Sequence, residues 1–289
     1  MNTEKTISVY GGTGFVGNNF LTLFPNTIQI QREQNEPLSD EILYLISTNH
    51  NYQVFDNPHL DINTNLNKLI DVLEACRKSN RDITFNFVSS WFVYGKKTTL
   101  PVKETDECNP EGFYSITKYA AEKIVASYCN TFKIKYRILR LTNMIGENAT
   151  GVSIKRNALQ YLIETLSDDG EIKLYNDGSD IRDFMHVHDA CRAIMKCIEN
   201  SPIGETINIS NAEPHTIGEL VRHAQARMGG KGKIISVDPP DFHKVVQSKD
   251  MYLDNTKLLS YGYIPSSDTY SVVNRIVDYI MERRVQNVS

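Results

Sequence analysis

The sequence predicts an α/β fold with a doubly wound, parallel β-sheet. Short β-rich runs alternate with amphipathic helical segments, a pattern that places helices on both faces of a parallel sheet. The first run, residues 7–10, leads into Gly11, Gly14 and Gly17, and an apolar segment at helical spacing then extends to Pro25. Glycines three apart let the backbone approach a pyrophosphate, which the N–H groups and positive end of the helix attract. This Rossmann-type turn predicts a dinucleotide site.

The predicted cofactor site comprises the glycine turn and the end of the second strand. The residues expected at the turn are Gly11, Gly14, Phe15, Val16 and Gly17. A glycine-rich turn without a ligand has the same pattern, so the assignment depends on further motifs. The second strand, 27–32, ends in Gln31 and Arg32, with no acidic residue to bond the ribose 2′-hydroxyl of NAD. Arg32 suits the 2′-phosphate of NADP, or is a surface residue without a role. We therefore favour NADP(H) over NAD(H).

The composition excludes several classes of protein. The 289 residues have a net charge of −4, from 31 basic and 35 acidic side chains. Neither sign forms a long run, so no nucleic-acid or membrane partner is expected. The five cysteines lack a C-x-x-C pair and are expected to be reduced thiols. No targeting segment is recognised, and no apolar run approaches the roughly eighteen residues of a membrane span. We expect a soluble, cytoplasmic protein.

The period of the apolar residues assigns the other elements. A short polar segment links residue 32 to the next apolar run at residue 41, so one expected helix–strand unit is missing there. Further strands are expected at 41–48, 83–88, 171–175 and 205–210. Further helices are expected at 60–79, 113–128, 154–169, 189–199, 216–228 and 271–284.

Two groups of polar residues predict catalysis. The strand at 83–88 runs into Ser89 and Ser90, at the carboxyl edge where a doubly wound sheet binds ligands. Tyr114 and Lys118 are four residues apart on the next helix, so a phenol and an ammonium share one face. A cation within about 4–6 Å lowers the pKa of an acid. The pair therefore predicts that Tyr114 is an acid/base near neutral pH.

Five motifs together resemble the extended short-chain dehydrogenase/reductase family, in particular its nucleotide-sugar epimerases, dehydratases and ketoreductases. The glycine turn, Ser-Ser-Trp-Phe-Val-Tyr-Gly at 89–95 and Tyr-Ser-Ile-Thr-Lys at 114–118 are similar to three motifs of this branch. Arg-Leu-Thr-Asn-Met-Ile-Gly at 140–146 is similar to a fourth. The segment 177–189, with Arg-Asp-Phe-Met-His-Val, is similar to a fifth. Because the motifs follow the family order, the chain is identified as a member.

The resemblance implies a catalytic group and selects between neighbouring candidates. It implies Ser90, Tyr114 and Lys118 as catalytic residues, with Lys118 also holding the nicotinamide ribose. Ser90 is preferred to Ser89. Tyr114 and Lys118 are preferred to Tyr119 and Lys123, which have the same spacing.

The resemblance also implies substrate contacts. Ser90 and Trp91 are expected near the sugar, and Asn143 and Arg182 at the nucleotide diphosphate, where a planar guanidinium can donate two bonds. His186 and His188 alternate along an extended segment like metal ligands, but the resemblance makes them structural. No metal is expected.

The resemblance implies two domains and a dimer. Residues 1–145, with about 186–210, should form the NAD(P)-binding Rossmann domain. Residues 146–185 and 211–289 should form a smaller, mixed lobe that holds the nucleoside-diphosphate sugar. A homodimer is expected through helices 60–79 and 114–130, with exposed apolar residues on both.

The implied reaction is NAD(P)(H)-dependent hydride transfer at a hexose carbon, usually C4, of a nucleoside-diphosphate sugar. Trp91 and Phe92 stand where 4,6-dehydratases carry Asp-Glu, and Trp91 also replaces the Cys of fucose-synthase-like enzymes. Both aromatic residues suggest a partly apolar pocket for a deoxy sugar. The preferred function is an NDP-4-keto-(deoxy)sugar reductase, because Arg32 and the short front half favour it. The alternatives are an NDP-sugar 4-epimerase with tightly bound NAD, or a non-catalytic cofactor-binding regulator.

Overall fold

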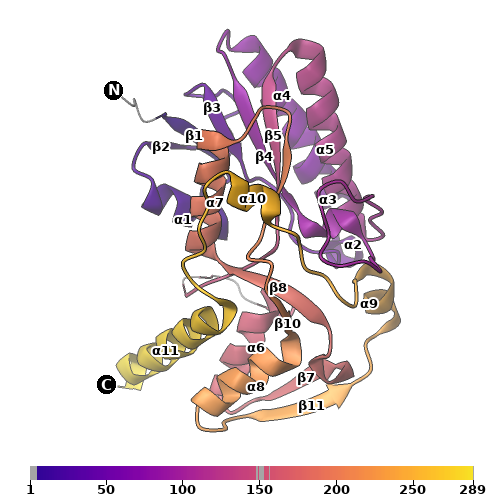
Figure 1. Ribbon diagram of the computed structural model, residues 1–289, viewed down its shortest axis with the longest axis vertical. Helices are drawn as coiled ribbons and strands as arrows, with labels where there is room; N and C mark the ends of the chain where they lie inside the picture. Colours follow the sequence, from indigo (N-terminus) through magenta and orange to yellow (C-terminus); the bar gives the residue numbers. More distant parts are fainter. Residues whose placement is uncertain (1–4, 148, 150–152, 156, 289) are drawn as a thin grey trace.

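A computed structural model describes residues 5–288 except 148, 150–152 and 156. Its larger part is built on a parallel sheet in the order β2-β1-β3-β4-β5-β9 (Figure 1). The strands are β1 (Ile7–Tyr10), β2 (Thr27–Ile30), β3 (Glu41–Tyr44), β4 (Thr84–Ser90), β5 (Lys135–Leu141) and β9 (Thr206–Ile209). All five pairs of neighbouring strands are parallel. The predicted α/β fold with a parallel Rossmann-type sheet is therefore confirmed.

One helix–strand unit is missing between β2 and β3, as the sequence predicts. The strand β1 pairs with β2 on one side and with β3 on the other. The segment 31–40 leads from β2 to β3 without an intervening helix or strand. The strands β2 and β3 end at Ile30 and Tyr44, before the predicted ends, so Arg32 lies in a turn beyond β2.

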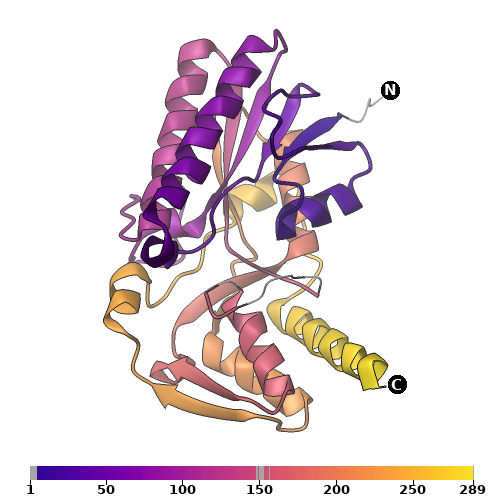
Figure 2. The ribbon, with the colours of Figure 1, turned by 180° about the vertical axis from the view of Figure 1, so that it is seen from behind.

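Helices cover both faces of the sheet because its strands are apolar on both sides. Adjacent residues point to opposite faces, so Ile42 packs in the core under α4 (Lys68–Lys78) and α5 (Phe113–Phe132). Leu43 packs in the core on the other face, under α1 (Phe15–Leu23) and α7 (Val187–Asn200). Figure 2 shows α4 and α5 side by side along one edge of the molecule.

The helix expected at 60–79 is divided into shorter elements. The expected range is covered by α3 (Pro58–Ile62), a π-helical turn (Asn63–Asn67) and α4, and a further short helix, α2 (Gln53–Asp56), precedes it. The side chain of Asn57 caps α3 by accepting a bond from the backbone N–H of His59, and Pro58 takes the first helical position. The π-helical turn buries Asn65, whose Oδ1 accepts a bond from the backbone N–H of Thr48 beyond β3.

A smaller group of elements lies below the large sheet in Figure 1. It contains the three-stranded sheet β10-β8-β6 and the parallel pair β11-β7. The strands are β6 (Asn143–Ile145), β7 (Glu171–Tyr175), β8 (Ile181–His186), β10 (Pro214–Thr216) and β11 (Lys233–Val237). The helices are α6 (Ala158–Ser167), α8 (Ile217–Arg227), α9 (Asp241–Val246) and α11 (Thr269–Val288); α10 (Thr256–Ser260) contacts β9 above them.

This lower region has a core of its own, formed by α6, α8 and α11 over β7 and β8. The helix expected at 154–169 begins only at Ala158, and no pattern predicted β11 or α9. The domain boundaries given above stay a prediction. No helix in the part of the chain that the structure describes is long and apolar enough to cross a membrane.

Candidate active site

The glycine turn has the geometry of a pyrophosphate cradle. Gly11 has a φ of +82°, and its carbonyl accepts a bond of 3.0 Å from the N–H of Gly14. A Cβ on Gly17 would lie 2.3 Å from the Gly11 oxygen, so only glycine lets α1 start this close to β1. Gly14 is the N-cap of α1 and offers no side-chain cap, which leaves N–H groups of the first turn for a ligand. These residues fit a dinucleotide.

A cavity of about 630 Å³ begins at this turn and continues past the carboxyl ends of β3, β4 and β5 to the lower region. Its position follows the rule that doubly wound sheets bind ligands at the carboxyl ends of their strands. The predicted residues that line it are Gly11, Gly14, Phe15, Val16, Gly17, Ser90, Trp91, Tyr114, Lys118, Asn143 and Arg182. Arg32 is exposed in the turn after β2 and is not among the lining residues.

Tyr114 lies in the first turn of α5 and faces the end of β4. Its side chain is buried, and the hydroxyls of Ser90 and Ser47 are near enough to lower the pKa of its phenol. Burial raises the pKa of Tyr114 above its ordinary value, and the two hydroxyls only partly offset this. The expectation of a phenol whose pKa Lys118 brings near neutral is therefore wrong for the protein without ligand, because desolvation dominates.

Lys118 lies one turn further along α5 and is only 3% exposed. Burial lowers the pKa of its ammonium to about 7, although the nearby Glu122 opposes this change. Glu122 is itself held by Arg140, whose Nε and Nη2 donate bonds of 3.0 and 2.7 Å to its two carboxylate oxygens. Lys118 is thus a desolvated cation at the cavity wall.

Trp91 and Asn143 are hydrogen-bonded to each other and, like Ser90, line the cavity. The indole N–H of Trp91 donates to Asn143 Oδ1 over 3.3 Å, and Asn143 Nδ2 donates to the Asp183 carbonyl over 3.0 Å. The ring of Trp91 stacks on Phe92 with centroids 3.9 Å apart. Both rings line the cavity, so the wall beside Ser90 is largely aromatic.

Arg182 lines the cavity, but both of its Nη atoms donate hydrogen bonds to backbone carbonyls. Its Nη1 donates to the carbonyls of Ile181 and Lys249, and its Nη2 donates to the Ser248 carbonyl at 2.7 Å. The guanidinium carbon lies 5.7 Å from the Trp91 ring centre. Arg182 therefore ties the segment after α9 to β8, and the role at the diphosphate stays a prediction.

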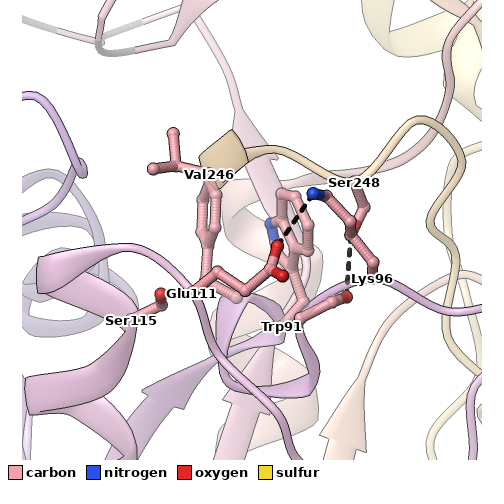
Figure 3. Close-up of a pocket in the computed structure, with 8 residues that line it drawn as sticks. Trp91, Lys96, Glu111, Ser115, Val246 and Ser248 are labelled. Atoms are coloured by element: carbon pink, nitrogen blue, oxygen red, sulfur yellow. Dashed lines mark hydrogen bonds and ion pairs between the residues drawn. The ribbon is translucent and has the colours of Figure 1, made fainter. Parts of the chain in front are cut away.

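The far side of Trp91 is closed by the same segment. Figure 3 shows Trp91 beside Val246 and Ser248, with Lys96 and Glu111 forming an ion pair of 2.9 Å across a small pocket. This pocket has a volume of about 10 Å³, enough for about one water molecule. The substrate-sized space thus lies on the Ser90 side of the aromatic wall.

Several cavity residues were missed by the sequence analysis. Ser47 and Thr48 follow β3, and the same carboxyl-edge rule that found Ser90 could have found them. Across the cavity, the Tyr52 hydroxyl lies 2.8 Å from His243 Nδ1, and the rings of Tyr52 and Phe242 are 5.2 Å apart. This contact joins the segment at α2 to α9. The two segments are remote in sequence, and no sequence motif indicates that they meet.

The two histidines of the fifth motif contact other side chains. His186 Nε2 lies 2.8 Å from Glu147 Oε2, and His188 Nε2 lies 2.9 Å from Asn19 Oδ1. Neither these residues nor others that the structure describes gather into a group of three or more histidine, cysteine or carboxylate ligands for a metal.

Comparison with known proteins identifies the family. The sequence profile of the NAD dependent epimerase/dehydratase family matches residues 28–210. The chain belongs to this family. A Methanocaldococcus jannaschii relative, provisionally named a UDP-glucose 4-epimerase, is 28% identical over 225 residues, covering 78% of this chain and 72% of the relative. A dTDP-glucose 4,6-dehydratase of Neisseria gonorrhoeae is 25% identical over 193 residues, covering 63% and 55% of the two chains. The predicted nucleotide-sugar branch is thereby confirmed.

Solved structures share the whole fold. The UDP-glucose 4-epimerase of Thermotoga maritima, crystallised with UDP-glucose, aligns with a TM-score of 0.86 at 20% identity, covering 96% of this chain and 99% of that structure. RMD from Pseudomonas aeruginosa, in complex with NADPH, aligns with a TM-score of 0.84 at 18% identity and covers 96% and 99%. Family membership implies a nicotinamide-dependent enzyme of nucleotide sugars.

Proposed function

We propose that the protein is a nucleoside-diphosphate-sugar 4-epimerase that works with NAD(H). The observation that carries the proposal is the position of Ser90, Tyr114 and Lys118 in the middle of the large cavity. One end of this cavity is the glycine turn and the other is the lower region. A dinucleotide and a nucleotide sugar can therefore meet at Tyr114.

The side chains supply the acid/base part of this reaction. Tyr114 would take the proton of the sugar C4 hydroxyl and later return it, and Ser90 would hydrogen-bond the same oxygen. The nicotinamide, when bound, supplies the hydride acceptor and donor. Lys118 would bind the nicotinamide ribose and, in its charged form, favour the phenolate.

Two lysines extend the substrate end of the cavity. Lys155 and Lys173 both line it, and the Lys155 ammonium lies 5.8 Å from the centre of the Tyr52 ring. Cations without a carboxylate partner suit a diphosphate, particularly since Arg182 is already bonded to backbone carbonyls. We assign the diphosphate to this end, with Asn143 and Arg182 as further contacts.

The identity of the residues after Ser90 favours epimerisation over dehydration. Trp91 and Phe92 carry no group that can add or remove a proton, whereas elimination of water from the sugar needs an acid and a base. Among the relatives, the names that specify a reaction on a UDP-sugar are mostly 4-epimerases. They support the epimerase better than the reductase that the sequence analysis preferred.

A 4-ketosugar reductase is the second candidate, and Arg32 favours it. The guanidinium lies in the exposed turn after β2, where the 2′-phosphate of NADP binds in related folds. Arg32→Ala should weaken NADPH binding about tenfold and leave NADH binding unchanged if this residue reads the phosphate. Equal effects on both cofactors would remove the argument for a reductase.

The deciding experiment uses purified protein without added cofactor. UDP-glucose and UDP-N-acetylglucosamine are incubated with it, and inversion at C4 is followed by proton NMR. An epimerase equilibrates the C4 epimers with NAD that remains bound, and Tyr114→Phe abolishes this. Absence of epimerisation together with NADPH consumption on a nucleoside-diphosphate 4-keto sugar would establish the reductase instead.

A further inference from the structure

A chain of aromatic rings, which we call the aromatic bridge, connects the two sides of the cavity. Its members are Tyr52 and Phe55 at α2, Phe242 and His243 on α9, and Tyr175 at the end of β7. Tyr52, His243 and Tyr175 line the cavity, whereas Phe55 is 65% exposed. The bridge therefore extends from the cavity wall to the molecular surface, at the rim of the cavity.

His243 is the central member of the bridge, because it contacts both sides of the cavity. Its Nδ1 lies 2.8 Å from the hydroxyl of Tyr52, on the side of the large sheet. Its ring centre lies 4.7 Å from that of Tyr175, on the side of the lower region. Burial, together with the charge of Arg182, lowers the pKa of His243 to about 4, so the imidazole is neutral near pH 7. A neutral imidazole nitrogen can donate to a phenol hydroxyl or accept from it, so either tautomer keeps the bond.

The bridge ties α9 to α2. In Figure 1, α9 lies next to α2 and away from α6 and α8. Phe242 packs against Tyr52 and Phe55 with ring centres 5.2 and 4.6 Å apart, edge to face in both pairs. The segment that follows α9 is fixed separately, because Arg182 donates to the Ser248 carbonyl at 2.7 Å. Loss of the bridge contacts would therefore loosen α9 while the chain after it stays anchored.

The end of the cavity that we assign to the diphosphate adjoins the bridge on both sides. The Lys155 ammonium is 5.8 Å from the centre of the Tyr52 ring. Lys173 precedes Tyr175 by two residues on β7, so the two side chains leave the same face of the strand. A diphosphate bound by these lysines would lie next to the bridge.

We propose that the aromatic bridge is a gate over the substrate end of the cavity, held closed by the bond between Tyr52 and His243. The gate opens to admit the nucleotide sugar and closes behind its diphosphate. In an epimerase, the 4-keto sugar formed by hydride transfer must rotate within the cavity without leaving it. Tyr52 is thus a positioning residue that acts through His243 and takes no part in proton or hydride transfer. The gate rests on the diphosphate end given above, and the retention of the keto sugar rests on the proposed function.

The test measures how fast UDP, or dTDP in its place, binds to the folded protein and leaves it. Trp91 is the single tryptophan of the chain and lines the cavity, so its fluorescence in a stopped-flow instrument reports binding. Tyr52→Phe keeps the ring and removes the bond to His243. One hydrogen bond of ordinary net strength changes a population about fivefold. The association and dissociation rate constants should therefore both rise about fivefold, and Kd should stay unchanged.

His243→Phe removes the other partner of the same bond and keeps a ring against Tyr175. It should give the same increases, and its combination with Tyr52→Phe should cause no further change, because both variants remove one bond. The matched control is Lys244→Met, which alters an exposed side chain of α9 that pairs with Asp241 on the same helix at 3.1 Å. Such an exposed pair contributes little, so both rate constants should stay native.

A rise in the dissociation rate constant alone would overturn the inference, because Tyr52 would then be a direct contact of the ligand. Unchanged rate constants, or folded protein that binds neither UDP nor dTDP, would overturn it as well. During turnover of UDP-glucose, Tyr52→Phe should accumulate bound NADH, because a 4-keto sugar that escapes leaves its hydride on the nicotinamide. A variant that epimerises without this accumulation would contradict the retention of the keto sugar. Faster UDP binding and release in protein that epimerises no sugar would support the gate and count against the proposed reaction alone.

Discussion

The ammonium nitrogen of Lys118 lies 4.2 Å from the centre of the Phe87 ring. The aromatic face attracts the cation, but by only about 1–2 kcal/mol. Desolvation is the larger effect and lowers the pKa of Lys118 to about 7. At neutral pH the protein without ligand therefore holds a lysine that is partly neutral, although the proposed reaction needs it charged.

Lys118→Met should stabilise the protein without ligand. The pKa of Lys118 is lower in the folded chain than the roughly 10.4 of an unfolded one, so the unfolded state binds more protons between these values. The cost of burying the charge is complete below about pH 7 and is lost as pH rises toward 10. We expect a gain on the order of 3 kcal/mol at pH 6 that shrinks at pH 9. Urea unfolding at both pH values measures it.

Lys123→Met is the matched control on the same helix. Lys123 is exposed and its ammonium lies 4.9 Å from the Tyr119 ring centre, so no comparable desolvation exists. Its unfolding free energy should change by less than about 0.5 kcal/mol at either pH. A loss of stability in Lys118→Met would show that the cation contributes more through Glu122 than its burial costs.

Tyr114→Phe should lower kcat by about 10²–10⁴-fold and leave cofactor binding intact. The phenyl ring keeps its packing against Phe92, whose centroid is 5.9 Å away, so only the hydroxyl is lost. Tyr119→Phe, at the second Tyr-x-x-x-Lys pair, should retain native kcat. Steady-state kinetics and fluorescence titration with NADH give the two quantities. Similar losses in both variants would contradict the choice of Tyr114.

The sequence predicted the parts of the site that local patterns encode. Glycine spacing predicted the turn, the rule for strand ends put Ser89 and Ser90 at the carboxyl edge, and the family resemblance selected Ser90 and Tyr114, which line the same cavity. The raised pKa of Tyr114 was not predictable, because it depends mainly on how deeply the folded chain buries the phenol. The contact between Tyr52 and His243 could not be predicted from the sequence either, because it depends on the path of the chain between β11 and α10.

Trp91→Ala should reduce selectivity for a sugar that lacks a 6-hydroxyl. The indole forms an apolar wall with Phe92, which favours a methyl group over a hydroxyl. We expect the ratio of kcat/KM for 6-deoxy and 6-hydroxy nucleotide sugars to fall about tenfold. The variant should also lose about 3 kcal/mol of stability because the buried ring leaves a cavity. An unchanged ratio would show that the ring is structural only.

Trp91→Phe separates packing from hydrogen bonding at the same position. It keeps a ring against Phe92 and removes the N–H that reaches Asn143 Oδ1. Sugar selectivity should persist, and stability should fall by about 1 kcal/mol or slightly more. Loss of selectivity in this variant would assign the effect to the orientation of Asn143 instead.

The dimer implied by the family resemblance can be tested on α4 and α5. Both helices expose large apolar side chains, with Ile70 at 40% and Ile116 at 46% exposure. Figure 2 shows that the two helices lie side by side, so they can pair with their equivalents about a two-fold axis. Glutamate at both positions in each of the two subunits would bury four charges in such a dimer interface. We expect Ile70→Glu/Ile116→Glu to be a folded monomer in sedimentation analysis.

Ile264→Glu provides the matched comparison, because Ile264 is 80% exposed and lies outside both helices. It should sediment like the native protein. A native protein that is monomeric at micromolar concentration would end the dimer hypothesis. A dimer that persists in the double variant would place the interface on another face, since one glutamate facing another in an apolar seam costs several kcal/mol.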